Sequence, residues 1–158
     1  MGMHFKIGLY EHQSAGALQG LLNLIQEDPN IASDVHSIAS IKISAYEPAF
    51  GIIGDPAKRD PETRQSADHS MVYLVATMLR KAHEVIEAEG DSLFGSSNDD
   101  VWKRLMLTPY DFAVDAINNE VTRSIMKIIE FKHGGESYDQ AYPDGIPTSI
   151  NIEIKGGP

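Results

Sequence analysis

A cluster of basic side chains is the feature of this chain best suited to chemistry. Four potential cations stand within twelve residues of an otherwise acidic sequence: Lys58, Arg59, Arg64 and His69. A cleft lined by one sign of charge attracts ligands of the opposite sign. We therefore expect Lys58, Arg59 and Arg64 to bind a small polyanion, such as a di- or tricarboxylate.

A structural interpretation of the same cluster stays open. The loop contains enough acids to pair its cations locally: Asp55, Asp60, Glu62 and Asp68. A single histidine such as His69 is also commonly a structural residue rather than a catalyst. Sequence patterns do not separate local ion pairs from a ligand site.

A second group lies at the N-terminus, where Lys6 and His12 flank a segment that leads into a predicted helix. Cations beside a helix N-terminus can hold the carboxylates of a substrate. A histidine there can also move protons at neutral pH. The alternative is that Lys6 and His12 are surface residues at a helix start.

Composition excludes several classes of function. The chain has no cysteine, so disulfides, thiolate catalysis and cysteine-based metal centres are excluded. A net charge of −10 argues against partners such as nucleic acids or anionic membrane surfaces. No apolar run is long enough to span a bilayer. We expect no metal, no cofactor and a cytoplasmic location, or the mitochondrial matrix in a eukaryote.

Apolar spacing and turn signals predict the elements that position these residues. In the first half we expect a short strand at Phe5–Leu9, a helix at Gln13–Glu27, a strand at Ile41–Ala45 with one wet face, and a helical turn at Ala49–Ile53. Asp60 and Pro61 then predict the start of one long helix, Pro61–Glu89, with an apolar stripe that includes Met71, Leu74 and Met78. His69 lies outside this stripe.

The second half predicts helices followed by strands. We expect a helix at Asp99–Met106, a helix opened by a Thr108–Asp111 capping box and bent at Asn118-Asn119, a hairpin of strands Lys127–His133 and Glu136–Tyr142, and a last strand at Ile150–Ile154. This order predicts an α+β fold, with a mostly antiparallel sheet covered on one face by helices. We expect a single domain over residues 4–158, after a trimmed or added start at residues 1–3.

Two segments resemble the MmgE/PrpD family, and in particular its smaller, C-terminal domain. Phe5-Lys6 with His12-Gln13-Ser14-Ala15 is similar to the start of that domain. The more specific segment reads Arg59-Asp60-Pro61-Glu62-Thr63-Arg64, followed by Ala67-Asp68-His69-Ser70. Weaker similarity continues to Asp144-Gly145-Ile146-Pro147, so the resemblance covers most of the chain.

The resemblance implies chemistry on small polycarboxylates, as in 2-methylcitrate dehydratases. Family members remove a proton next to a carboxylate, without a required iron–sulfur cluster, at a site between a large helical domain and a small α+β domain. Lys6 and His12 match a segment beside that site, and His69 is implied as site-proximal. The helical domain is missing from this chain, so we expect a homodimeric domain that is inactive alone. The alternative is a non-catalytic interaction or oligomerisation module that retains the fold.

Overall fold

A small mixed sheet organises the protein. The computed structural model describes residues 8–53 and 55–156 of the 158-residue chain. Within them, three strands are arranged in the order β2-β1-β3: β1 (Ile38–Ala45), β2 (Ile129–His133) and β3 (Thr148–Ile154). β1 pairs in parallel with β2 and antiparallel with β3. The α+β class is confirmed, but the sheet has one pair of each kind rather than being mostly antiparallel.

Alternation along β1 separates a buried face of the sheet from an open one. Ile41 and Ile43 are fully buried, and each is paired with an isoleucine of β3. The intervening Lys42 points to the other face, where its Nζ lies 2.7 Å from the Glu153 carboxylate. Because successive side chains of a strand point to opposite faces, the predicted strand with one wet face is confirmed.

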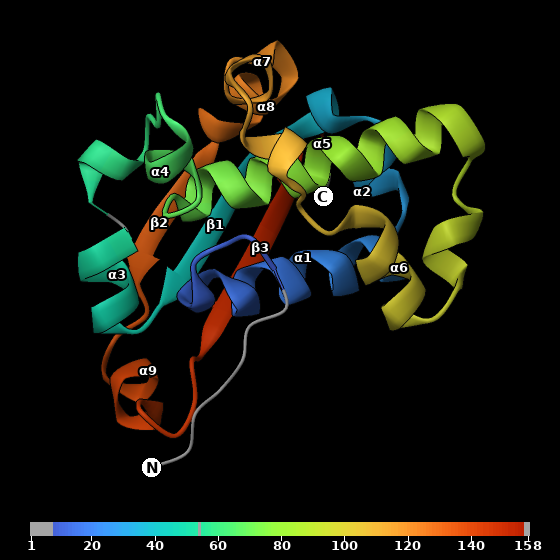
Figure 1. Ribbon diagram of the computed structural model, residues 1–158. Coiled ribbons are helices and arrows are strands. Elements are labelled where there is room, and N and C mark those ends of the chain that lie inside the picture. The colour runs from blue at the N-terminus through green and yellow to red at the C-terminus, as the bar shows by residue number, and fades with distance from the viewer. Residues whose placement is uncertain (1–7, 54, 157–158) are drawn as a thin grey trace.

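Helices make up most of the described residues; α1 and α5 are the long ones, and the others are short (Figure 1). The α-helices are α1 (Ala15–Glu27), α2 (Asn30–Ser33), α3 (Glu47–Ile53), α4 (Arg64–Ala67), α5 (Met71–Glu89), α6 (Asn98–Leu105), α7 (Val114–Ile117), α8 (Glu120–Met126) and α9 (Glu136–Ala141). The 3-10 turns in residues 8–53 and 55–156 are η1 (His12–Ser14), η2 (Val35–Ser37), η3 (Pro56–Lys58), η4 (Ser92–Gly95) and η5 (Pro109–Phe112). None of the described helices is long and apolar enough to cross a membrane.

Helix α5 is the centre of the core. Every residue from Met71 to Arg80 is buried, and α5 packs against α1, α2 and α8. A helix that is apolar on nearly all sides must be enclosed by other elements. The predicted stripe of Met71, Leu74 and Met78 is therefore covered within this chain, and no second chain is needed to bury it.

The predicted single helix Pro61–Glu89 is wrong, because two N-caps divide it. Thr63 caps α4 in a reciprocal box with Ser66, and Ser70 adopts an extended conformation and accepts from the Tyr73 N–H, which starts α5. Serine and threonine hydroxyls compete with helical hydrogen bonds and favour helix starts. Asp60 does not cap a helix and instead pairs with Arg123.

The predicted strand Glu136–Tyr142 is also wrong, because Glu136–Ala141 form α9 and Tyr142 is its C-cap. Gly135, with a φ of 90°, turns the chain after β2, and the Glu136 and Gln140 side chains are hydrogen-bonded across one helical turn at 2.9 Å. A side chain at Gly134 would collide with the Tyr138 ring, 2.5 Å from its nearest atom. The two glycines therefore mark a strand-to-helix turn, not a hairpin.

The other predicted elements are found, with shifted ends. The helix at Gln13–Glu27 corresponds to η1 and α1, and the helix at Asp99–Met106 to α6. The Thr108 box exists, since Asp111 accepts from the Thr108 N–H at 2.7 Å, and the chain bends where Asn119 caps α8. Of the strand predicted at Phe5–Leu9, only Gly8 and Leu9 are described, and they form a bend.

Helix α1 lies unusually close to β3. A Cβ atom added at Gly16 would stand 2.9 Å from the Thr148 hydroxyl, and one added at Gly20 would stand 2.9 Å from an Ile150 methyl. Both distances are shorter than van der Waals contact allows, so only glycine fits at these positions. The two glycines thus allow α1, which begins beside His12, to pack directly against β3, the edge strand of the sheet.

Candidate functional site

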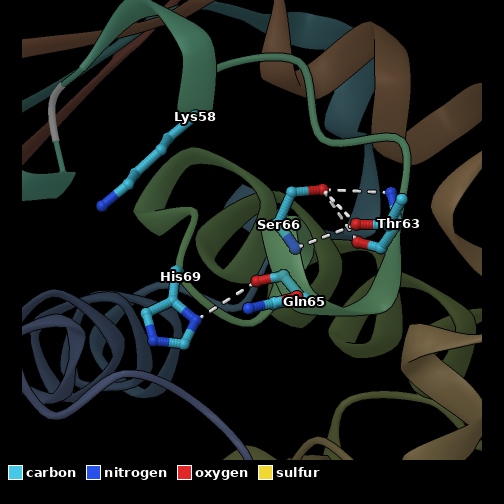
Figure 2. A pocket seen from close by; sticks show the side chains of 5 residues that line it. All are labelled: Lys58, Thr63, Gln65, Ser66 and His69. Carbon is cyan, nitrogen blue, oxygen red and sulfur yellow. Dashed lines mark hydrogen bonds between the residues drawn. The ribbon is translucent and has the colours of Figure 1, made fainter.

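A pocket of about 350 Å³ opens at the start of α4. Its described lining consists of Lys58, Thr63, Gln65, Ser66 and His69. Lys58 comes from η3, and the others come from α4 and the residues on either side of it (Figure 2). The structure therefore brings two of the predicted site residues, Lys58 and His69, to one opening.

Internal hydrogen bonds occupy the two hydroxyl groups of the pocket. The Ser66 hydroxyl accepts from the Thr63 N–H at 3.0 Å and donates to the Thr63 carbonyl at 2.9 Å, while the Ser66 N–H donates to the Thr63 hydroxyl. The Lys58 ammonium and the Gln65 side-chain amide have no hydrogen-bond partner among the described residues. Lys58, Gln65 and His69 are thus the side chains that can meet a ligand.

The imidazole of His69 is held on one side only. Its Nδ1 contacts the Asp68 carboxylate and lies 3.2 Å from the Gln65 carbonyl oxygen. Its Nε2 has no partner in the described part of the chain, and 53% of the side chain is exposed. A histidine held this way can exchange a proton with a ligand through Nε2.

The two remaining cations of the cluster lie on the surface but not in the pocket. Arg59 and Arg64 are both exposed, and neither they nor Lys58 forms an ion pair with an acid in residues 8–53 or 55–156. The predicted local pairing is found only for Asp68 and His69. Asp60 pairs with Arg123, and Asp55 caps η3 by accepting from the Ala57 N–H at 2.9 Å. Lys58, Arg59 and Arg64 therefore keep charges that no described acid neutralises by an ion pair, although Asp55 and Glu62 of the same loop are exposed as well.

The segment that carries His12 lies beside the same turn. The Glu11 N–H donates to the Asp68 carbonyl oxygen at 2.9 Å, which places η1 next to the turn that holds His69. His12 itself is exposed. Lys6 lies outside the described residues. The structure thus brings the His12 segment and the basic loop to the same region, although they are far apart in sequence.

Comparison with known families identifies the domain. A family model described as the MmgE/PrpD C-terminal domain matches residues 10–141. This chain belongs to that family. No curated protein matches the chain. The match begins before η1 and ends at the last residue of α9, so it includes His12, the basic loop and the pocket, and it confirms the resemblance seen in the motifs.

Arg123 of this MmgE/PrpD domain was not found from the sequence, although it holds the basic loop. From α8, its guanidinium donates to the Pro61 carbonyl and to the Ile117 carbonyl, both at 2.7 Å, and it also pairs with Asp60. Its partners in the loop lie more than sixty positions away along the chain. No local pattern signals such a tether, which fixes the loop on the C-terminal side of Lys58 and Arg59.

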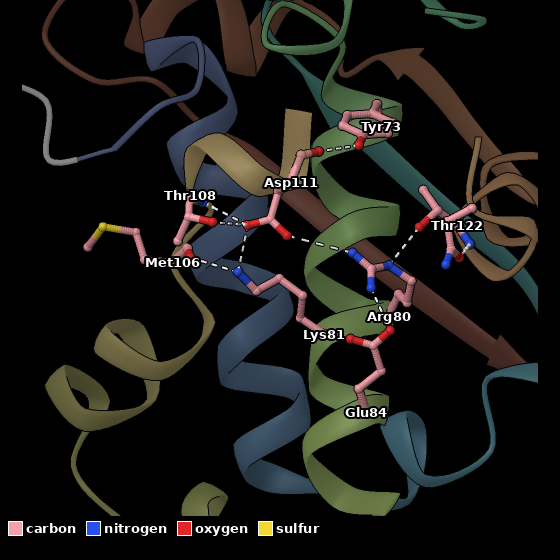
Figure 3. Close-up of polar contacts among 9 residues, drawn as sticks. Tyr73, Arg80, Lys81, Glu84, Met106, Thr108, Asp111 and Thr122 are labelled. Atoms are coloured by element: carbon pink, nitrogen blue, oxygen red, sulfur yellow. Dashed lines mark hydrogen bonds and ion pairs between the residues drawn. The ribbon is translucent and has the colours of Figure 1, made fainter. Parts of the chain in front are cut away.

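A buried ionic cluster on α5 of the MmgE/PrpD domain was also not expected. The Asp111 carboxylate accepts from Lys81 Nζ at 2.7 Å and lies 3.6 Å from an Arg80 nitrogen (Figure 3). Arg80 donates further to the Thr122 hydroxyl at 2.9 Å. These contacts join α5 to η5 and α8 and satisfy charges that are largely buried. The cluster is a structural element rather than a ligand site, because its charged groups are already paired with one another.

Metal binding has no support among the described residues of the MmgE/PrpD domain. No group of three or more histidines and acids in this part of the chain is arranged to hold a metal ion. His133 forms ion-pair contacts instead, with its Nε2 2.9 Å from Asp139 and 3.8 Å from Glu47. These contacts join β2, α9 and α3 at one end of the sheet.

Proposed function

We propose that this MmgE/PrpD domain forms one wall of an active site for small polycarboxylates, in a lyase of the 2-methylcitrate dehydratase type. The observation that supports this is the pocket beside α4. Its described lining includes Lys58 and His69 and no acid, although the whole chain has a net charge of −10. A positively lined opening on an acidic protein selects anionic ligands.

The proposed reaction removes water from the substrate. A base takes the proton from the carbon next to a carboxylate, a carbon–carbon double bond forms, and the β-hydroxyl leaves with a proton as water. Lys58 binds a substrate carboxylate. Arg59 and Arg64, which lie on the surface outside the pocket lining, and Lys6 are proposed as further binding cations. His69 and His12 are the proposed proton-transfer groups, since the ring nitrogens of an imidazole can accept and donate a proton.

The opposite wall of the site is proposed to come from a helical domain of the family type, with a homodimer as the assembly. Catalysis requires the acid, the base and the carboxylate-binding groups to be held together. The 158-residue chain alone should therefore show no turnover of 2-methylcitrate when the unsaturated product is followed by ultraviolet absorbance. Turnover by the isolated domain would contradict the two-walled site.

Binding of a carboxylate to this wall can be tested directly. Tricarballylate, a stable tricarboxylate, should shift the backbone NMR signals of Gln65 and His69 in a saturable way at low salt. Lys58→Ala should weaken this binding roughly twofold to fivefold, the effect of one exposed charge pair. The control is Lys103→Ala, which removes one exposed charge from α6, at the far end of α5 from the pocket (Figure 1).

Two outcomes would count against the proposed site. One is the absence of any saturable shift at Gln65 and His69, which would favour the interaction module. The other is equal weakening by Lys58→Ala and Lys103→Ala, which would mean that tricarballylate responds only to net charge. Screening by salt should reduce the binding, because the interacting charges are exposed.

A further inference from the structure

Asp68 connects the two histidine segments of the candidate site. Its carboxylate contacts Nδ1 of His69, and its main-chain carbonyl accepts the N–H of Glu11 at 2.9 Å. It lies in the three-residue turn between α4 and α5, directly before His69. One residue therefore contacts the imidazole through its side chain and holds the η1 segment through its backbone.

The contacts of His69 decide which ring nitrogen carries the proton in the neutral imidazole. Nδ1 faces two groups, the Asp68 carboxylate and the Gln65 carbonyl oxygen at 3.2 Å. Both groups are acceptors only, because neither an ionised carboxylate nor a carbonyl has a proton to donate. Nδ1 must therefore be the donor, and the lone pair of the neutral ring lies on Nε2.

We propose that Asp68 is a positioning residue that fixes His69 in the Nδ1–H tautomer, so that Nε2 is available to accept a proton. When Nε2 takes that proton, the ring becomes an imidazolium, and the Asp68 carboxylate stays ionised and stabilises the new charge. The carbonyl of the same residue keeps the His12 segment against this turn. Only the use of Nε2 as a base rests on the proposed function, because the tautomer follows from the contacts alone.

A second aspartate–histidine pair in the chain provides a matched control. Asp139 lies 2.9 Å from His133, but it contacts Nε2 rather than Nδ1. The same argument assigns the opposite tautomer, Nε2–H, to neutral His133. His69 and His133 are thus expected to be opposite tautomers in the same sample.

The test is an NMR measurement of histidine tautomers. In the 158-residue chain labelled with ¹⁵N-histidine, long-range ¹H–¹⁵N correlations at mildly alkaline pH distinguish Nδ1–H from Nε2–H for each neutral ring. We expect His69 to be mainly Nδ1–H and His133 mainly Nε2–H. Asp68→Ala should raise the ratio of Nε2–H to Nδ1–H at His69 roughly threefold or more, as expected for an exposed charge-assisted hydrogen bond. Asp139→Ala should leave His69 unchanged.

The controls separate a tautomer effect from a loss of structure. The Glu11 amide donates to the Asp68 carbonyl, which every side-chain variant retains, so its slow hydrogen exchange reports that the turn is intact. Asp68→Asn keeps an acceptor oxygen without the charge and should give an intermediate ratio at His69. If Asp68→Ala does not fold, Asp68→Asn and the wild-type spectrum decide the question.

Two results would overturn the inference: a mainly Nε2–H ring at His69 in the wild type, or a ratio at His69 that neither Asp68 variant changes. The tricarballylate titration is an independent measurement. The Nδ1–H tautomer without tricarballylate binding would refute the proposed function and leave the role of Asp68 as the tautomer-fixing residue in place.

Discussion

Replacement of Arg123 by alanine should both destabilise the domain and loosen its basic loop. The side chain is 23% exposed, and it joins α8 to the loop through the Pro61 carbonyl and to the end of α7 through the Ile117 carbonyl. It also pairs with Asp60, which is 78% exposed. Loss of these contacts frees the loop residues that follow Lys58.

The cost can be worked out contact by contact. A hydrogen bond from a charged group contributes about 1.5 kcal/mol at the lower end of its range, and an exposed ion pair contributes less than about 1 kcal/mol. The two carbonyl bonds therefore dominate. In the variant, water can hydrogen-bond the two carbonyls at this partly exposed position and replace part of the lost energy. We therefore expect the free energy of unfolding to fall by about 2–3 kcal/mol.

Urea unfolding followed by circular dichroism measures this loss. With a denaturant dependence of about 2 kcal/mol per molar, typical of small domains, the midpoint should fall by about 1–1.5 M. Arg104→Ala is the matched control, because Arg104 is paired with Glu89 alone among the described residues, at the surface, and its loss should cost less than about 1 kcal/mol. Arg123→Ala should also weaken tricarballylate binding although Lys58 is intact. If the midpoint shift of Arg123→Ala is no larger than that of Arg104→Ala, the Arg123 contacts do not stabilise the domain as proposed.

Three further predictions concern the core, the sheet end and the reaction. Asp111→Ala should lower the free energy of unfolding in urea by about 3 kcal/mol, because it leaves the largely buried Lys81 ammonium without its counter-charge. The main-chain N–H of Glu47, together with His133, lowers the pKa of Asp139. The ionised Asp139 therefore stabilises the fold above its ordinary pKa, and this stabilisation is lost as the pH falls through the lowered pKa. Between about pH 5 and pH 3, the Asp139→Asn variant should therefore lose less stability than the wild type. In the intact protein, Lys6→Ala should raise KM and His12→Ala should lower kcat in steady-state kinetics.

Each of these predictions has a contradicting result. An Asp111→Ala midpoint close to that of Asp144→Ala, an exposed turn acid, would show that the buried cluster adds little. Equal acid sensitivity of the wild type and Asp139→Asn would remove the role of the Asp139 contacts. Wild-type kinetics in both Lys6→Ala and His12→Ala would exclude those residues from catalysis.

Local sequence signals predict the fold best where residues close in sequence determine the backbone conformation. The Thr108 box, the bend at Asn119 and the alternation of β1 depend on neighbours within a few residues, so the sequence contains their cause. The break between α4 and α5 was also present in the sequence, as the capping residues Thr63 and Ser70. Apolar periodicity does not predict this break, because the apolar stripe continues across Ser70. Periodicity alone does not show that the Ser70 hydroxyl competes for a backbone N–H and starts a new helix.

The wrong hairpin prediction involved a strand whose partner lies far away in the sequence. Gly134-Gly135 suggested a hairpin, but β2 pairs in parallel with β1, which lies far back in the chain. The short-range Glu136–Gln140 pairing already favoured a helix at α9 over a strand. In the site, Lys58 and His69 were found because they are close in sequence. The Arg123 tether and the approach of Glu11 to Asp68 depend on tertiary structure, which no local pattern encodes.

The sheet extends beyond the part of the chain that identifies the family. The family match ends at residue 141, whereas β3 spans Thr148–Ile154 and pairs along most of β1. Lys155 adds two further anchors, through its N–H to Ser37 and its ammonium to His36. A protein truncated at the match boundary would expose the backbone of β1 and the glycine side of α1, and unpaired strand edges promote aggregation. The recognisable unit and the foldable unit are therefore different, and boundaries for producing this domain should be placed after Lys155.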